Sequence, residues 1–253
     1  MDRRQLIEEY QRDHSKYEVY SQLTVEPGMF ALRLDGRGFS SLTKNLEKPF
    51  DMRFHAAMDK VAESLMQEIS EAIYCYCQSD EISILMPMES QFFGRRVEKL
   101  CSVAAATATL SFYRQLEIKG IFDARVLHLP TAEDALAMLA ERQSDARKNS
   151  LSMLVYWTLR NQGQNASAAT KSLKGLTSSE RKELLEQLNN PFDNLSPELK
   201  LGRSLTRQSV EHRGYNPITR EHVLTMRRHL FWQRQLEDFS CLTTLPWEQN
   251  QVP

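Results

Sequence analysis

Acidic residues at two places in the chain have the type and spacing to hold a divalent metal ion. Asp35 ends the alternating run in "ALRLDGRGFSSL", and Asp80 and Glu81 stand together in "QSDE". Two carboxylates that meet repel each other unless a positive charge lies between them, and Mg²⁺ suits this place because it takes oxygen ligands and bridges to phosphates. A pair of such ions would hold the attacking and leaving oxygens of a phosphoryl-type displacement.

The glycines that follow Asp35 indicate a phosphate-binding loop. Gly36 and Gly38 let the backbone pass close to a ligand, and "GRGFSS" offers backbone N–H groups to phosphate oxygens. A strand that ends in Asp-Gly is also common in ordinary turns, and "SDE" is also compatible with an exposed hairpin. The chemistry therefore depends on whether the fold brings the two motifs together.

Hydrophobic periodicity predicts the elements that must do so. "GMFALRLD" alternates as a strand, Asp51 can cap a helix with apolar residues at helical spacing, and "AIYCYC" and "ISILMP" are two strands joined by "QSDE". A long helix follows, with Phe93, Val97 and Leu100 at the start of one apolar face, and "FDARVLHLP" is a fourth strand. The predicted order over residues 29–130 is strand, helix, strand, strand, helix, strand.

This order predicts an α+β fold with a ferredoxin-like βαββαβ antiparallel sheet, the arrangement of polymerase palms. In that topology the first strand lies antiparallel beside the third, so the end of the first meets the start of the third. Asp35 and the "SDE" hairpin should then be neighbours. The residues alone thus predict a palm-like, two-metal site for nucleotidyl transfer.

The second half of the chain is predicted to form a helical and mixed extension. Residues 131–190 have helical patterns, with Thr177 or Ser178 as a cap, "RSLTRQSVEH" is compatible with a strand, and no firm prediction follows for the chain after Gly214. We expect a palm-like core with an N-terminal helix over residues 1–130 and an extension over 131–253 that packs on it as one compact unit. Tyr156 and Trp157, in an apolar helical stretch, are predicted to be core residues.

Composition bounds the class of protein. The chain has 253 residues, of which 41% are hydrophobic, and no apolar run approaches the roughly 18 residues of a membrane span. The charged amphipathic start lacks the apolar stretch of a secretory signal, so we expect a protein of the cytoplasm with no membrane partner. The four cysteines form no C-x-x-C pair, which predicts reduced thiols and no structural zinc.

The net charge of -1 conceals an asymmetry. Residues 1–90 carry 10 Lys+Arg against 16 Asp+Glu, which is -6, so the remainder carries +5. Residues 141–182 hold 8 basic and 3 acidic side chains, and residues 203–234 hold 7 arginines and 2 glutamates. Both segments could face a polyanion, although solvated helix faces would look the same.

Six segments in order resemble one protein family. They are "LRLDGRGFSSLTKNLEKPFD", "YCYCQSDEISIL", "RRVEKLCSVAAATATLSFYR", "FDARVLHLP", "RQSDARKNSL" and "SLKGLTSSERKELL". Together, over about residues 27–217, they resemble the tRNA-His guanylyltransferase superfamily, and within it the bacterial and archaeal Thg1-like proteins. The resemblance implies a polymerase-like palm that adds nucleotides to the 5′ end of tRNA in the 3′-to-5′ direction, after ATP or GTP has activated the 5′-monophosphate.

The resemblance also implies roles for individual residues. Asp35, the carbonyl of Gly36 and Asp80 would hold Mg²⁺, two ions per site, with Glu81 as a further acidic catalytic residue. The nucleoside triphosphate would be bound by Asp35, Gly36, Arg37, Gly38, Phe39, Ser40, Ser79 and Asp80. Contacts to phosphates or RNA are expected from Lys48, Arg96, Lys99, Arg142, Arg147, Lys148 and Lys174.

The chain departs from the eukaryotic pattern at two places. Ser40 stands where the eukaryotic enzymes have histidine, and "RKNSLSM", residues 147–153, replaces their "HINNLYN" while retaining Asn149 and Leu151. Template-dependent repair of truncated tRNA 5′ ends therefore fits better than selective addition of guanosine to tRNA-His. Members of this branch are commonly tetramers, so a homo-oligomer is expected.

Two other readings of the same residues stay open. A nucleotide cyclase or another palm-type nucleotidyltransferase would use paired carboxylates on the same strands. A non-catalytic RNA-binding module would keep the palm as a docking surface, and it would bind tRNA with a steep salt dependence without releasing pyrophosphate.

Overall fold

The computed structural model describes residues 2–14, 16–242 and 245–248. Its helices are α1 (Arg3–Arg12), α2 (Phe39–Leu42), α3 (Met52–Glu68), α4 (Val97–Leu116), α5 (Ala132–Asn161), α6 (Ala166–Leu173), α7 (Ser178–Gln187) and α8 (Pro197–Leu201). Its strands are β1 (Met29–Gly36), β2 (Tyr74–Gln78), β3 (Glu81–Met86), β4 (Phe122–Leu129), β5 (Arg203–Asn216) and β6 (Glu221–Gln233). Short 3₁₀ helices lie at Val19–Gln22, Phe92–Arg95, Phe192–Asn194 and Phe239–Cys241.

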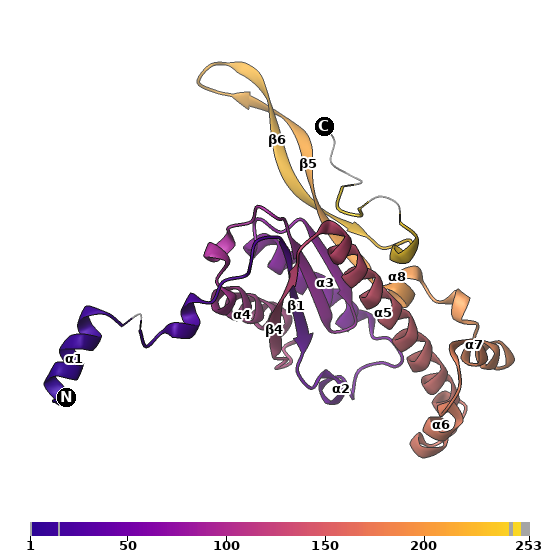
Figure 1. The fold of residues 1–253 in the computed structure, drawn as a ribbon. Helices are drawn as coiled ribbons and strands as arrows, with labels where there is room; N and C mark the ends of the chain where they lie inside the picture. The colour runs from indigo at the N-terminus through magenta and orange to yellow at the C-terminus, as the bar shows by residue number, and fades with distance from the viewer. Residues whose placement is uncertain (1, 15, 243–244, 249–253) are drawn as a thin grey trace.

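The strands form one antiparallel sheet in the order β4-β1-β3-β2-β5-β6. The predicted βαββαβ core is confirmed over residues 29–129, and β1 lies antiparallel beside β3 as the topology requires. Helices α3 and α4 pack on one face of the sheet, and α5 packs on the other (Figure 1). The sheet is therefore the middle of three layers.

Alternation along β1 decides which residues meet which layer. Phe30, Leu32 and Leu34 are fully buried against α3 and α4, whereas Met29 and Ala31 pack toward α5. Since side chains on a strand alternate between faces, Asp35 must share the α5 face with Met29 and Ala31. The run that looked like a strand in the sequence thus delivers its carboxylate to the side that α5 covers.

Helix α5 is longer than the strands of the sheet. Its 30 residues span about 45 Å, whereas an eight-residue strand spans about 27 Å. The first half, with Ala135 and Leu139, covers the sheet. The second half, with Leu151 and Val155, leaves the sheet and packs against α6 and α7 in a separate cluster that includes Ala169. This overhang supplies a wall beside the end of β1.

Local signals explain the helix ends. Asp51 caps α3 by accepting hydrogen bonds from the backbone N–H groups of Arg53 and Phe54, and Thr177 caps α7, both as predicted. Helix α4 was predicted to include Phe93, but it begins at Val97. Phe93 and Gly94 interrupt it because they adopt left-handed backbone conformations, with φ 51° and φ 60°.

The prediction of a helical extension describes residues 132–201. Beyond them the chain forms β5 and β6, which extend the same sheet because β5 pairs with β2 through Arg203–Thr206. Past Thr206, β5 pairs only with β6 in the described part of the chain, and the two strands project from the body as a ribbon (Figure 1). We call residues 207–230 the arm. Helix α1, which buries none of its residues, projects in another direction.

In the described ranges, no helix combines the length and apolar character that a membrane crossing requires.

Candidate active site

A cleft of about 700 Å³ opens at the end of the sheet where β1 finishes. One wall is the overhanging part of α5, and the facing wall is the loop of residues 40–51. The floor is made by the start of α3 with the β2–β3 turn, and α8 with the start of β5 closes one side. Every layer of the fold therefore contributes to this cleft.

The predicted acidic residues meet at this cleft. Asp35 lies opposite Glu81 in the β1–β3 register, Asp80 occupies the tight turn just before Glu81, and all three line the cleft. Burial raises the pKa of the Asp80 carboxyl, and the nearby charge of Asp35 raises it further. Burial also raises the pKa of Glu81, against the opposing effect of Arg142. The fold thus places adjacent carboxylates where their negative charges are costly.

These residues fit a magnesium ion that is bound by few protein ligands. Among the described residues, no group of three or more His, Cys, Asp or Glu side chains is arranged to hold a metal by itself. The donors present are two carboxylates and the carbonyl of Gly36 next to Asp35, and Mg²⁺ characteristically completes its shell with water and substrate phosphates. Glu81 Oε1 is buried without a hydrogen-bond partner, which leaves one more acceptor beside the pair.

The glycine-rich loop divides between the cleft and the core. Ser40 lines the cleft, but the Phe39 ring is also buried against Phe112 and Phe122, with ring centroids 5.0 Å away in each case. A Cβ at Gly36 would lie 2.4 Å from the Phe39 ring, so that close approach requires glycine. Phe39 therefore acts through packing that fixes the loop.

The other predicted loop residues lie at the rim. Arg37 is exposed, and its backbone N–H donates to the carbonyl of Ile121 at 2.8 Å. Gly38 starts α2 with φ 69°, a conformation that favours glycine. Ser79 lines the cleft and holds φ 46° in the β2–β3 turn, which directs the chain into Asp80. Of these three residues, only Ser79 belongs to the cleft wall.

Of the predicted basic contacts, Lys48 lies in the cleft wall. Arg142 stands at the carboxylate end, where its guanidinium is 3.4 Å from Glu81 and 2.8 Å from Asp145. Arg147 is 3.4 Å from Asp238. Arg142 is thus held among carboxylates and orients Glu81, instead of standing free for a phosphate.

The remaining basic residues are not brought to the cleft. Lys148 is exposed and 3.7 Å from Asp145, and Lys174 is exposed at the end of α6. The backbone of Arg96 forms an isolated antiparallel β-bridge with that of Thr24, five residues before β1 starts, and Lys99 lies about one turn further along, in α4. Since β1 runs about 20 Å from Met29 to Asp35, Arg96 and Lys99 lie at the opposite end of the strand from the carboxylates.

Sequence reasoning missed several residues of the cleft. They are Lys44, Glu47, His55, Ser152, Trp157, Glu198 and Arg203. Trp157 was predicted to be a core residue, but the structure places it in the cleft wall. Arg203 gave no signal, because a buried arginine can be recognised only once its partner is known.

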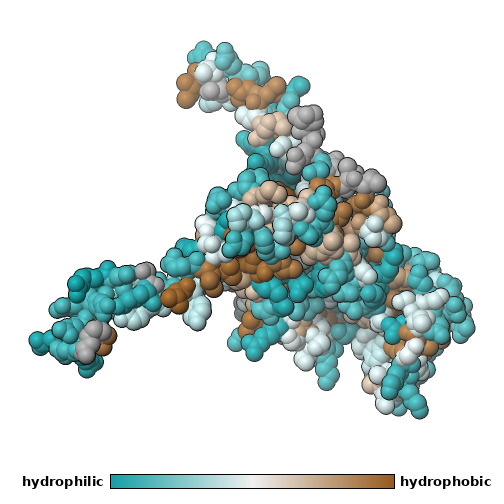
Figure 2. Space-filling view, viewed as in Figure 1, coloured by the Kyte–Doolittle hydropathy of each residue, from teal (hydrophilic) through white to brown (hydrophobic). Residues whose placement is uncertain are grey.

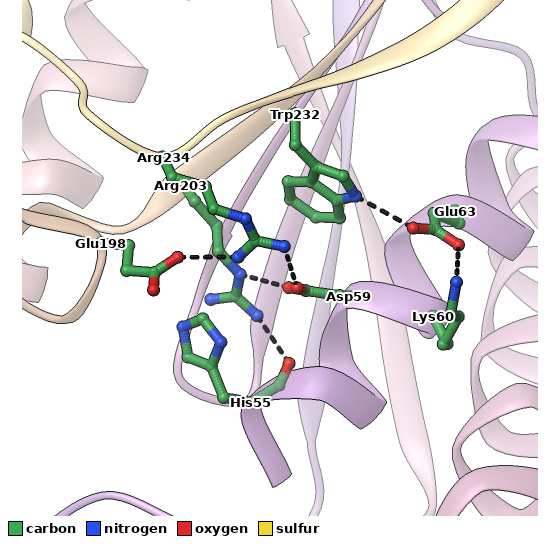
Figure 3. Close-up of polar contacts among 8 residues, drawn as sticks. All are labelled: His55, Asp59, Lys60, Glu63, Glu198, Arg203, Trp232 and Arg234. Atoms are coloured by element: carbon green, nitrogen blue, oxygen red, sulfur yellow. Dashed lines mark hydrogen bonds and ion pairs between the residues drawn. The ribbon is translucent and has the colours of Figure 1, made fainter. Parts of the chain in front are cut away.

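A buried charge cluster joins the base of the arm to the cleft floor (Figure 3). Asp59 on α3 accepts from Arg203, which is 1% exposed, and from Arg234 at 2.6 Å. Arg234 also binds Glu198 at 2.7 Å. Arg203 donates in addition to the carbonyl of His55 at 3.0 Å. Both ends of the arm are therefore fastened to the same carboxylate.

The neutral ring of His55 predicts a loss of stability in mild acid. Burial and the charge of Arg203 lower its pKa to about 4, against the opposing charges of Asp59 and Glu198, and Arg234 lowers it further. The unfolded chain therefore takes up this proton first, so stability should fall as the pH drops from about 6.5 toward 4.

Between pH 7 and pH 5 we expect His55→Gln to remove about 1 kcal/mol of this loss, a value reduced for solvent screening of the half-buried ring. Urea unfolding at both pH values measures it. His229→Gln, at an exposed site on the arm, is the matched control. An equal pH dependence in wild type and His55→Gln would contradict the assignment.

The antiparallel sheet, with carboxylates at the end of its first strand and at the start of its third, defines a palm-like fold. Residues 11–130 match the family described as tRNAHis guanylyltransferase. With the relatives and structures below, this match shows that the chain belongs to the tRNA(His) guanylyltransferase superfamily.

Relatives in plants and mammals agree. The chain is 28% identical to tRNA(His) guanylyltransferase 1 of Arabidopsis thaliana over 251 residues, covering 88% of this chain and 44% of that protein. It is 31% identical to a probable tRNA(His) guanylyltransferase of Mus musculus, covering 71% of this chain and 65% of that protein. The chain thus spans about half to two thirds of the length of these two relatives.

Solved structures share the fold. A bacterial Thg1-like protein in complex with GTP superposes with a TM-score of 0.69 at 26% identity, covering 90% of this chain and 92% of that one. A bacterial Thg1-like protein in complex with ATP gives a TM-score of 0.71 at 24% identity, covering the same shares. The palm-like fold extends through nearly all of the chain.

Proposed function

We propose that this protein is a magnesium-dependent nucleotidyltransferase that adds nucleotides to the 5′ end of tRNA in the 3′-to-5′ direction. The observation that carries the proposal is the meeting of Asp35, on β1, and Asp80, in the β2–β3 turn, in one cleft although they are 45 residues apart in the sequence. Family membership supports it, because the relatives are named as tRNA(His) guanylyltransferases. The ATP and GTP complexes of the bacterial structures support these nucleotides as substrates.

The proposed reaction has two steps. First, a 5′-phosphate oxygen of the RNA attacks the α-phosphorus of ATP or GTP, and pyrophosphate leaves. Second, the 3′-hydroxyl of an incoming nucleotide attacks the activated 5′-phosphorus, the nucleoside monophosphate leaves and the hydroxyl proton is released. If the 5′ end is a triphosphate, pyrophosphate leaves in this second step.

Asp35, the Gly36 carbonyl and Asp80 would hold Mg²⁺, two ions per site. The metal would supply the positive charge that the phosphates and both carboxylates require. Arg142 orients Glu81 beside the pair. Ser40, Ser79 and Lys48 in the cleft wall would contact the triphosphate. The Phe39 packing keeps the loop of Gly36 and Gly38 at the rim, where its N–H groups can reach phosphate oxygens.

The arm and the outer surface of α5 would bind the RNA. The arm carries five arginines, at positions 207, 213, 220, 227 and 228, against two glutamates, at 211 and 221. Apolar side chains such as Leu224 and Met226 are exposed among these charges. Figure 2 shows brown, hydrophobic areas among the hydrophilic ones on the projecting arm. Arg213 lies 4.0 Å from Glu211, and Arg207 donates to the carbonyl of Ala72 at 3.2 Å, but the excess of arginines on a narrow support suits a polyanion such as an RNA backbone.

Replacing Arg213, Arg227 and Arg228 together by alanine should weaken tRNA binding and flatten its salt dependence. Each phosphate contact that is lost should reduce the slope of log K against log salt by about 1. Filter binding from 50 to 200 mM salt measures both quantities. The matched control replaces three arginines of α1, at positions 3, 4 and 12. An unchanged slope in the arm variant would count against RNA binding by the arm.

We favour template-dependent repair of shortened tRNA 5′ ends over selective guanosine addition to tRNA-His. Arg147 stands where the eukaryotic proteins have histidine, and it is exposed beside Asp238. We also propose that the protein belongs to the bacterial and archaeal Thg1-like branch, assembles as a tetramer and acts in the cytoplasm.

The test incubates the protein with labelled nucleotides, Mg²⁺ and 5′-monophosphorylated tRNAs that lack their first nucleotide. We expect extension opposite the 3′ strand for several tRNAs, with pyrophosphate released during activation. Extension of tRNA-His alone by one guanosine would replace repair with guanosine addition. A cyclic nucleotide product would indicate a cyclase, and tight tRNA binding without any product would indicate an RNA-binding module.

A further inference from the structure

Trp157 differs from the other two tryptophans because it belongs to no hydrophobic core among the described residues. Trp247 is 8% exposed within the core beneath α5, and Trp232 packs against the α3 side while its indole N–H donates to Glu63. Trp157 is half-buried in the cleft wall. A large aromatic ring that belongs to no core and lines a cleft is available to pack against a bound ligand.

The indole is held in place from its own helix. The Tyr156 ring lies perpendicular to it with centroids 5.3 Å apart, and the Arg160 guanidinium lies 5.7 Å from its centroid. Arg160 in turn donates to the Tyr156 hydroxyl at 3.0 Å. These neighbours support the ring from the helix side and leave it as part of the cleft wall.

The position of Trp157 along α5 sets its distance from the carboxylates. Ala146, Asn149, Met153 and Trp157 follow each other at helical spacing and line the cleft as one stripe. Arg142, one turn before Ala146, contacts Glu81. From Ala146 to Trp157 the helix rises about 16 Å. The ring therefore lies about three turns from the carboxylate end.

The loop of residues 40–51 brings two lysines to the same cleft. Lys44 and Lys48 line the cleft, and neither has an ion-pair partner in the described part of the chain. The cleft thus offers carboxylates for a metal at one end, two ammonium groups on the loop, with Glu47 between them in the sequence, and an aromatic ring about three turns further along α5. This set of groups suits an elongated anion that ends in a flat ring.

We propose that Trp157 is the stacking platform for the base of the nucleoside triphosphate. Stacking uses the face that every base possesses, so it gives affinity without selecting between adenine and guanine. The proposal rests on the proposed function, which assigns the triphosphate to this cleft, and it adds the residue that takes the base. A cleft that accepts ATP and GTP alike is the direct consequence.

The test measures binding of ATP, GTP and inorganic tripolyphosphate, each with Mg²⁺ and without RNA. Trp157→Ala should weaken ATP and GTP by a similar factor of about 5 to 150 and leave tripolyphosphate, which has no base, unchanged. Trp157→Phe should stay within about threefold of wild type for all three ligands. Tyr113→Ala, at an exposed aromatic of α4, is the matched control.

Unchanged ATP and GTP affinities in Trp157→Ala would overturn the proposal. So would an equal loss for tripolyphosphate, which would show a structural role. Because no product is measured, nucleotide binding that depends on Trp157 in a protein without transferase activity would support the base site and refute the proposed function.

Discussion

Asparagine in place of Asp35 or Asp80 is expected to lower the rate of nucleotide addition by about 10³-fold or more while the protein stays folded. Each substitution keeps the shape of the side chain and removes the charge that the metal needs. Burial and the charge of Asp35 raise the pKa of the Asp80 carboxyl, so its ionised form is unfavourable in the folded protein. The Asp80→Asn variant should therefore be at least as thermally stable as wild type.

Single-turnover extension of a 5′-shortened tRNA measures the rate, and thermal unfolding checks the fold. The matched control is Asp123→Asn, because Asp123 pairs with Asp35 across β1 and β4 but is exposed and bound to Arg125 at 3.1 Å. It should retain nearly full activity. A stable Asp35→Asn or Asp80→Asn protein with wild-type activity would remove the metal assignment.

Asp59→Ala is expected to cost about 3–5 kcal/mol of unfolding free energy, because it leaves the buried Arg203 guanidinium without its counter-charge. Arg234→Ala should cost at most about 1 kcal/mol, since the Arg234 side chain is 41% exposed. Urea denaturation of both variants measures the difference.

A double variant separates charge burial from packing. Asp59→Leu with Arg203→Met replaces the buried pair by apolar side chains, and it should recover most of the stability that Asp59→Ala loses. If the double variant is as unstable as Asp59→Ala, the cost comes from the shape of the site, and the electrostatic account of the cluster fails.

The core of the fold could be predicted because its signals are local and its topology is constrained. Phe30, Leu32 and Leu34 alternate strongly, Asp51 and Thr177 are good helix caps, and four short strands with two helices admit few arrangements. The encounter of Asp35 with Asp80 and Glu81 then follows from antiparallel pairing alone.

The sequence was compatible with a strand only over residues 203–212 of β5, and the rest of the arm could not be predicted because a ribbon with solvent on both faces has no apolar side. Val210 pairs with Arg227, and Arg213 pairs with Leu224, so each face mixes charge with hydrophobic residues and the alternation disappears. Its base is fixed by Asp59, about 145 residues earlier in the chain, and only the folded structure shows this contact.

Trp157 was mistaken for a core residue for a related reason. Its neighbours Leu154, Val155 and Leu159 are buried, so the sequence window is apolar. Trp157 lies in the part of α5 that extends past the sheet, where the sheet does not bury it. How far a helix extends past its sheet is a property of the tertiary structure, so the local sequence does not show it. Arg96 and Lys99 show the opposite case, because the family resemblance suggested contacts to phosphates or RNA and the length of β1 separates them from the carboxylates.

Asp59 binds Arg203 before the arm and Arg234 after it, so both strands of the arm are fixed at their base. The turn at residues 217–220 can therefore be lengthened, shortened or labelled without changing the cleft that contains Asp35. A fluorescent probe placed at that tip would report the approach of a macromolecule long before its end arrives at Asp35. A label on the arm would therefore measure binding of the RNA separately from nucleotide addition in the cleft.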